Sequence, residues 1–166
     1  MIIGHLTNDE FELIKKSLSQ NKGMSSLETD NLNLKHPYAF PKEGGALILS
    51  SMEHYGLHDK NLNSFILNKF GKPEYEIDFF YKLTYNVGDY TNPHLDRYFV
   101  TQTTLVLLSE NFTGGRLLIN KKDVQFDREG TYINFNGNIE EHEVTKVESG
   151  FRSVLVIMFN NKKTII

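Results

Sequence analysis

The stretch EYEIDFFYKLTYNVG, residues 74–88, alternates between apolar and polar side chains over most of its length. One face of the extended chain would carry Tyr75, Ile77, Phe79, Tyr81, Leu83 and Tyr85, and the other Glu76, Asp78, Lys82 and Thr84, with Phe80 as the exception. Side chains of a β-strand point in turn to its two faces. The pattern therefore predicts a long strand with one buried face.

Shorter strand candidates follow this stretch, and turns rich in Gly, Asn and Asp separate them. They span residues 100–108, 116–120, 124–127, 131–135, 142–147 and 151–159. Gly114 and Gly115 indicate a hairpin turn or a bulge, because no lysine or helix pattern follows them as in a phosphate loop. Many short strands favour a mainly β fold of the double-stranded β-helix type, the jelly roll of the cupins, which avoids open sheet edges.

The residues before the long strand predict two helices. The first lies within LTNDEFELIKKSLSQNKG at 6–23, where Thr7 and Glu10 have the spacing of a capping box and Gly23 lies just past the end. The second begins after an N-cap at Asp59 and ends before Gly71. Their apolar stripes consist of Phe11, Ile14 and Leu18 in the first helix and of Leu62, Phe65, Ile66 and Phe70 in the second.

The length favours one domain with a substantial core. We expect a single domain at 1–166, in which 1–73 provide helical and loop support and 74–160 form the jelly-roll core. Residues 24–42 are polar and irregular and predict a loop, whereas 45–51 predict a short strand.

The composition excludes several kinds of chemistry. The chain has no cysteine, which excludes disulfides, thiolate zinc sites, iron–sulfur clusters and cysteine nucleophiles. A formal net charge of -3 gives no bulk electrostatic reason to expect nucleic acid. The first residues lack the pattern of a signal peptide, and no window is apolar enough to span a bilayer. We therefore expect a cytoplasmic protein without a membrane partner.

His94 and Asp96 lie two residues apart in YNVGDYTNPHLDRYF. In an extended segment, residues i and i+2 point the same way, so the imidazole and the carboxylate face one point. His142, at the start of a later strand candidate, is the candidate third ligand. Two histidines and one carboxylate form the facial triad that holds Fe(II) with open positions. The competing interpretation is a coincidental motif, with Asp96 pairing with Arg97 or capping a turn.

Arg152 begins the apolar run FRSVLVIMF, and period 2 places it on an inward face. A buried guanidinium is unfavourable unless an anion meets it, and its planar fork matches a carboxylate. A tight turn at 148–150 would bring its strand beside that of His142. The iron and the arginine together predict a site for 2-oxoglutarate. The alternative is a salt bridge with a core acid, although period 2 assigns no acid to that face.

The ordered series YNVGDYTNPHLD, TTLVLLSENF, GGRLLI, EGTYINF, EEHEV and GFRSVLV resembles the Fe(II)/2-oxoglutarate-dependent dioxygenases, and among them the prolyl-hydroxylase-like branch. The resemblance covers residues 79–159, about half of the chain. It implies that His94, Asp96 and His142 are the iron ligands. It also implies that Arg152 binds the distal carboxylate of 2-oxoglutarate.

The resemblance implies further contacts with the cosubstrate. Tyr85 matches the tyrosine that opens the family's Tyr-x-x-Gly segment, which implies a hydrogen bond to 2-oxoglutarate. Many members carry a second cosubstrate tyrosine on the strand after the His-x-Asp turn, where Leu107 stands here. Thr103, on the same face, is the candidate for a replacement hydroxyl. Related halogenases lack the carboxylate ligand, so the presence of Asp96 favours hydroxylation.

The resemblance implies hydroxylation of an unactivated C–H bond, with Fe(II) as the cofactor and 2-oxoglutarate and O₂ as cosubstrates. The branch points to a prolyl residue of a peptide or protein as the substrate. A free amino acid, another small metabolite or a nucleobase is the alternative substrate. A non-catalytic β-sandwich that binds a metal or another ligand is the alternative class of protein.

Overall fold

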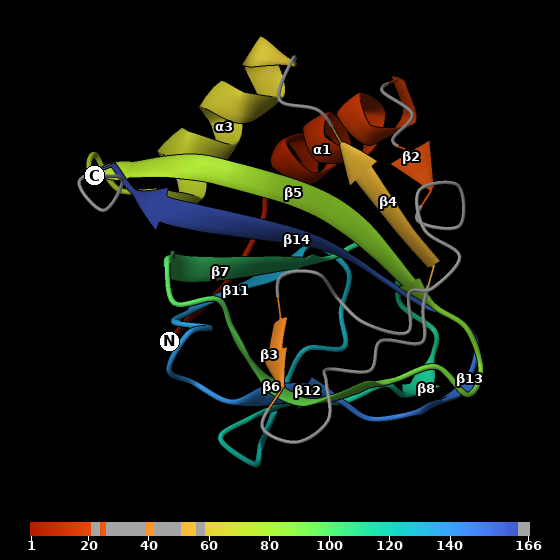
Figure 1. Cartoon of the computed structure of the whole chain (residues 1–166). Coiled ribbons are helices and arrows are strands. Elements are labelled where there is room, and N and C mark those ends of the chain that lie inside the picture. The colour runs from red at the N-terminus through yellow and green to blue at the C-terminus, as the bar shows by residue number, and fades with distance from the viewer. Residues whose placement is uncertain (21–23, 26–38, 42–50, 56–58, 163–166) are drawn as a thin grey trace.

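A computed structural model describes the chain at residues 1–20, 24–25, 39–41, 51–55 and 59–162. In this part of the chain, two layers of antiparallel sheet lie against each other, and two helices cover one outer face (Figure 1). Most of the strand predicted at 45–51 and most of the loop predicted at 24–42 fall outside the described residues.

Among these residues the larger sheet has seven strands in the order β1-β11-β7-β14-β5-β4-β2, and the smaller has five in the order β10-β9-β12-β6-β3. The strands of the larger sheet are β1 (Ile2–His5), β2 (Met24–Ser25), β4 (Ser51–Tyr55), β5 (Tyr75–Tyr85), β7 (Val100–Leu107), β11 (Thr131–Phe135) and β14 (Arg152–Asn161). Those of the smaller are β3 (Ala39–Pro41), β6 (Thr91–Asp96), β9 (Leu117–Ile119), β10 (Lys122–Val124) and β12 (His142–Val144). A short ribbon pairs β8 (Thr113–Gly114) with β13 (Val147–Ser149).

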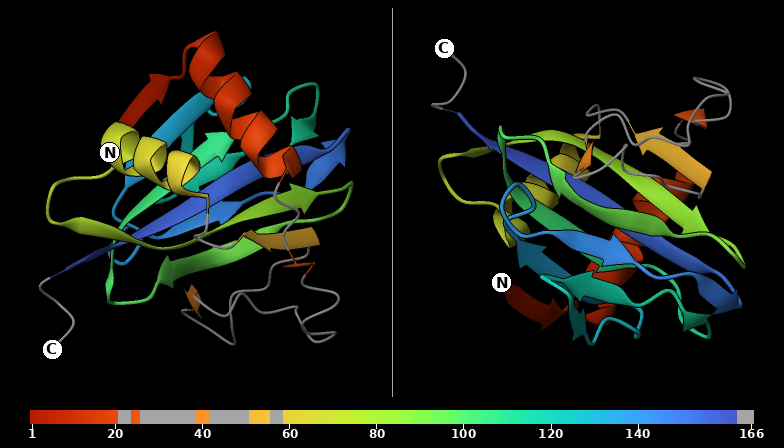
Figure 2. Two further views of the ribbon diagram at one scale, coloured as in Figure 1. Left: turned by 90° about the horizontal axis from the view of Figure 1, so that it is seen from above. Right: turned by 60° about the horizontal axis from the view of Figure 1, so that its bottom comes forward.

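The helices are α1 (Asn8–Gln20) and α3 (Lys60–Phe70), and both lie over the larger sheet (Figure 2). The predicted capping box is present, because the Thr7 amide donates to Glu10 Oε1 at 2.9 Å and the Glu10 amide donates to Thr7 Oγ1 at 3.2 Å. The carboxylate of Asp59 accepts the Leu62 amide at 3.0 Å and caps α3. Neither helix of the described chain is long and apolar enough to cross a membrane.

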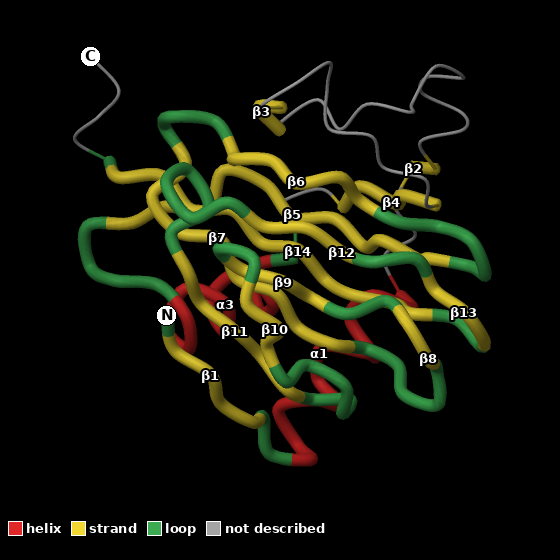
Figure 3. The backbone as a smooth tube through the Cα atoms, turned by 90° about the horizontal axis from the view of Figure 1, so that it is seen from below, coloured by secondary structure: helices red, strands yellow, loops and turns green. Residues whose placement is uncertain are grey.

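The two faces of the larger sheet belong to two separate apolar clusters. The outer cluster, on the helix side, consists of Ile14, Leu18, Leu62, Ile66, Phe70, Phe80, Val106, Leu155, Ile157 and Phe159. The inner cluster consists of Tyr81, Leu83, Tyr85, Val100, Leu105, Leu107, Leu117, Ile119, Val124, Phe126, Ile133, Phe135, Val144, Val147, Val154, Val156 and Met158. Figure 3 shows the smaller sheet from the side away from the helices. The fold is therefore the predicted one, a mainly β double-stranded β-helix with N-terminal helices.

The long strand predicted from residues 74–88 is present as β5, but its apolar side chains do not all lie on one face. β5 pairs Phe79 with Met158 and Ile77 with Phe159, so Asp78 is the extra residue of a β-bulge. A bulge shifts the alternation of side chains by one residue. The part of β5 before the bulge, including Ile77, therefore packs against the outer cluster, and the prediction of one common face is wrong there.

Several short strands of the structure also differ from the sequence predictions. β1 was not predicted, and β2 and β3 lie within the segment predicted as a loop. The strand predicted at 142–147 is two strands, β12 and β13. The ribbon that contains β13 carries the chain from the smaller to the larger sheet. The strands of His142 and Arg152 are therefore not neighbours as predicted, but lie in opposite sheets.

Candidate functional site

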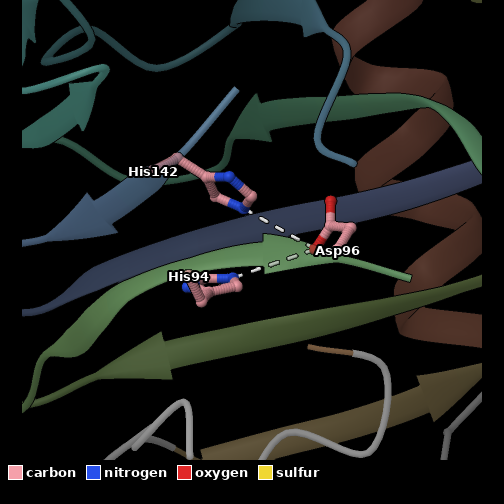
Figure 4. Close-up of side chains that lie close together, drawn as sticks. All are labelled: His94, Asp96 and His142. Atoms are coloured by element: carbon pink, nitrogen blue, oxygen red, sulfur yellow. Dashed lines mark ion pairs between the residues drawn. The ribbon is translucent and has the colours of Figure 1, made fainter. Parts of the chain in front are cut away.

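Strand β6 positions two of the predicted ligands. His94 and Asp96 are buried on the same side of the strand, as period 2 predicts, and the side chain of Leu95 between them is more exposed. Strand β12 lies beside β6 with His142 directly opposite His94. All three side chains converge between the two sheets (Figure 4).

The three side chains form one candidate metal centre. One ligand atom from each of His94, Asp96 and His142 lies within 4.8 Å of the others. Asp96 Oδ1 is 3.8 Å from His94 Nε2 and 3.6 Å from His142 Nε2, and the two imidazole rings are 4.2 Å apart at their centroids. Two imidazoles and one carboxylate around a single point form the donor set of a facial Fe(II) triad. The donor set therefore fits an iron ion.

Hydrogen bonds orient both imidazoles toward this point. His94 Nδ1 lies 2.8 Å from the carbonyl oxygen of Asn92, and His142 Nδ1 lies 2.9 Å from that of Glu140. A carbonyl only accepts hydrogen bonds, so each Nδ1 carries the proton and donates it. Nε2 of each ring then presents its lone pair to the common point, which is the tautomer that metal binding requires.

Burial sets the protonation states of the triad. It lowers the pKa of His142 to about 4, and it lowers the pKa of His94 to about 4 with help from the neighbouring His142. Both imidazoles are therefore neutral near pH 7. Burial also raises the pKa of Asp96, against the opposing effects of His94 and of a hydrogen bond from Thr103. A cation at this point would offset the unfavourable burial of the carboxylate.

Arg152 is the largest fully buried side chain of the described chain, with 0% exposure. In that part of the chain, its Nε and both terminal nitrogens have no hydrogen-bond partner. The guanidinium carbon lies over the rings of Tyr85 and Phe126, 5.3 Å and 5.6 Å from their centroids. Burial lowers its pKa. The predicted alternative, a salt bridge with a core acid, is not present among the described residues.

One cavity joins the arginine to the metal ligands. Its walls come from both sheets and consist of Tyr81, Leu83, Tyr85, Thr91, His94, Asp96, Thr103, Leu105, Leu117, His142, Glu143, Val144, Arg152, Val154, Val156 and Met158. The predicted metal ligands, the predicted cosubstrate arginine and the predicted Tyr85 and Thr103 thus meet at one place. Leu107 is buried in the inner cluster, while Leu105 lines the cavity.

The two predicted cosubstrate hydroxyls already have partners. Tyr85 Oη lies 2.7 Å from Thr91 Oγ1, and the hydroxyl of Thr103 donates to Asp96 Oδ2 at 2.5 Å. Thr91 was not a predicted site residue. It reaches the cavity because the pairing of β6 with β12 shifts between His142 and Val144, which changes the side-chain alternation before His94.

Phe126 and Gly137 were also not predicted. The guanidinium of Arg152 lies over the ring of Phe126, which belongs to a segment outside the strands. In the sequence, an apolar residue at this position resembles any other core residue. Gly137 lies against Asp96 and accepts its amide hydrogen at 2.8 Å. A glycine shortly before His142 was the available signal, since glycine permits a close approach of backbone to a neighbouring group.

No protein-family model matches the sequence, and no curated protein matches it either. Solved structures do match. A 2OG-Fe(II) oxygenase family oxidoreductase from Burkholderia pseudomallei is 15% identical, with 95% of this chain and 84% of that chain covered and a TM-score of 0.60. A collagen prolyl hydroxylase of Paramecium bursaria Chlorella virus-1, in complex with 2OG, is 14% identical. The match covers 96% of this chain and 95% of that chain, with a TM-score of 0.63.

A third match is a prolyl hydroxylase from Trichoplax adhaerens, in complex with a peptide fragment of the hypoxia inducible factor. It is 15% identical, with 98% of this chain and 84% of that chain covered and a TM-score of 0.62. The chain therefore has the fold of the 2OG-Fe(II) oxygenases. Two of these matching structures are prolyl hydroxylases, the branch that the sequence resembles.

Proposed function

We propose that the protein is an Fe(II)/2-oxoglutarate-dependent dioxygenase that hydroxylates an unactivated C–H bond. The observation that carries the proposal is Arg152, whose buried guanidinium has no hydrogen-bond partner in the described chain and lines the same cavity as the His94, Asp96 and His142 cluster. A buried charge without a partner is strongly unfavourable. An anionic ligand that reaches both the metal and the arginine would offset it.

The charges favour a dicarboxylate as that ligand. Fe(II) together with the Asp96 carboxylate has one net positive charge, and Arg152 adds another. 2-Oxoglutarate has two negative charges, so the assembled site is neutral and tolerates burial. Its keto acid end suits the metal, and its distal carboxylate suits the fork of the guanidinium.

The protein's part in this chemistry is binding and orientation. Iron, when bound by His94, Asp96 and His142, supplies the activation of O₂ with 2-oxoglutarate as the reductant. The carbonyls of Asn92 and Glu140 hold the two imidazoles in their ligand tautomer. Apolar side chains of the inner cluster line much of the cavity, and such surroundings strengthen the electrostatic interactions within it.

We propose a prolyl residue of a peptide or protein as the substrate. The support is the likeness to the viral collagen prolyl hydroxylase and to the Trichoplax enzyme, which binds a peptide. Mass spectrometry of proline-containing peptides after incubation with the protein, Fe(II), 2-oxoglutarate and O₂ tests this substrate. The expected product carries one additional oxygen atom on proline. An oxygen atom added only to free metabolites would contradict the peptide substrate and leave the reaction type standing.

Iron-dependent conversion of 2-oxoglutarate to succinate tests the reaction type. The parent protein is expected to form succinate with Fe(II) and none with Mn(II), which occupies the same ligands without supporting the reaction. A His94→Ala variant is the control and is expected to form none with either metal. A parent protein that binds Fe(II) and 2-oxoglutarate but forms no succinate with any peptide or metabolite pool would instead be a non-catalytic binding module.

A further inference from the structure

The hydroxyl of Thr103 fixes one of the two carboxylate oxygens of Asp96. Thr103, on β7 of the larger sheet, donates to Asp96 Oδ2 at 2.5 Å across the space between the sheets. The other oxygen, Oδ1, faces His94 Nε2 and His142 Nε2. A hydroxyl–carboxylate bond of this length is at the short end for a charge-assisted hydrogen bond. The two oxygens of Asp96 thus have different partners.

Gly137 encloses the same oxygen from another side. A methyl group at Gly137 would overlap Asp96 Oδ2 and crowd Thr103 Oγ1. The carbonyl of Gly137 accepts the Asp96 amide at 2.8 Å, so the backbone of Asp96 is also held there. Asp96 and Thr103 have exposures of only 3% and 1%. Oδ2 therefore lies in a closed space that Thr103 and Gly137 form together, turned away from the two imidazoles.

We infer that Thr103 is a positioning residue that keeps Asp96 a one-oxygen ligand. The inference rests on the proposed function, since it concerns the same metal centre. A carboxylate that binds through both oxygens occupies two positions on an ion. With Oδ2 bonded to Thr103, Asp96 occupies one position. Two imidazoles and one oxygen then leave the open positions that a chelating cosubstrate and O₂ need.

This role differs from the one that the sequence predicts for Thr103. The single hydroxyl hydrogen of Thr103 points to Asp96, so it is not available to donate to 2-oxoglutarate. Thr103 thus acts on Asp96, the candidate metal ligand, and does not itself donate a hydrogen bond to 2-oxoglutarate. The competing explanation is purely structural, namely that the bond only satisfies a buried hydroxyl. Thr104, the next residue of β7, is buried and also has such a bond, to Asn134 Oδ1 at 2.8 Å, but it does not line the cavity.

Co(II) binding separates the two explanations, because cobalt reports both affinity and coordination. The variants are Thr103→Val, which removes the hydroxyl at similar volume, Thr103→Ser, which keeps it, and Thr104→Val as the matched control. Calorimetry gives the affinity, and the visible absorption of bound Co(II) gives the coordination. Loss of a hydrogen bond to a metal ligand typically weakens metal binding by about 10–100-fold.

We expect Thr103→Val to weaken Co(II) binding by about 10–100-fold and to change the absorption spectrum. Thr103→Ser and Thr104→Val should both match the parent. Equal affinity and spectrum in the parent and in Thr103→Val would overturn the positioning role while leaving the metal centre intact, as would an equal loss in Thr104→Val. A parent protein that does not bind Co(II) at all would instead overturn the proposed function and the positioning role with it.

Discussion

The two faces of the larger sheet bury polar groups in different ways. On the helix side, Gln102 is buried and donates to the Phe70 carbonyl at 2.8 Å and to Thr104 at 3.0 Å. On the inner side, Arg152 is buried without any hydrogen-bond partner in the described chain, beside three metal-ligand candidates. Polar groups that serve only the fold find partners within it. Within the described residues, the inner face instead leaves the guanidinium of Arg152 unpaired, where a ligand would complete it.

The largest expected effect on stability is at the outer face. Ile157 of β14 has 0% exposure and belongs to the outer cluster. Ile157→Ala should lower the free energy of unfolding by about 2–5 kcal/mol, through lost burial and the cavity that remains. Urea unfolding measures this change. Co(II) affinity of the folded variant should equal that of the parent, and a large loss of affinity would show that the two faces are not separable.

A substitution at the start of the same strand is expected to act in the opposite direction. Arg152→Met replaces the unpaired guanidinium by an apolar side chain of similar length. It should leave the free energy of unfolding unchanged or raise it by about 1–4 kcal/mol, since buried charges are often less stable than apolar replacements. The same urea titrations, on protein without 2-oxoglutarate, test it. A loss as large as that of Ile157→Ala would mean that the guanidinium stabilises the fold and that the contrast between the faces is wrong.

Acidification is expected to destabilise the metal-free protein through the two buried imidazoles of the inner face. His94 and His142 have pKa values lowered to about 4, below the ordinary value of 6.5. Between these values the unfolded chain binds protons that the folded one does not, so stability of the metal-free protein falls as the pH decreases from about 6.5 to 4. The raised pKa of Asp96 acts in the opposite direction and reduces the effect.

Thermal unfolding of chelator-treated protein across this pH range measures that dependence. His142→Gln removes one of the two titrating imidazoles and should flatten the pH profile. An unchanged profile in this variant would show that the acid sensitivity arises elsewhere in the chain. Bound metal should keep the dependence at least as steep, because metal on Nε2 excludes protons from the folded chain and not from the unfolded one.

Much of the site could be predicted because it depends on local alternation. His94 and Asp96 share a side because they are two residues apart on one strand, and Arg152 faces inward because its strand continues as an apolar run. The capping box of α1 is equally local, since its hydrogen bonds join residues three apart. In each case the information lies within a few residues, where the period of the backbone decides direction.

The parts that escaped prediction depend on bulges and on pairing between distant strands. The bulge at Asp78 moves the first part of β5 to the helix side, and the register shift between β6 and β12 places Thr91 in the cavity. The contact of Phe126 with Arg152 and that of Gly137 with Asp96 join residues far apart in the sequence. Periodicity carries no information on such contacts, because register is decided by the partner strand.

We propose that Arg152 and the metal centre together bind one molecule of 2-oxoglutarate. Titration of 2-oxoglutarate into the anaerobic Fe(II)-loaded protein, followed by the metal-to-ligand absorption band, tests it most directly. Truncating one partner of a buried charge pair costs about 2–5 kcal/mol. At about 1.4 kcal/mol per tenfold, Arg152→Ala should weaken binding roughly 30- to several-thousand-fold, with Fe(II) affinity unchanged and Arg152→Lys between the two. Equally tight binding of 2-oxoglutarate by Arg152→Ala would contradict the claim.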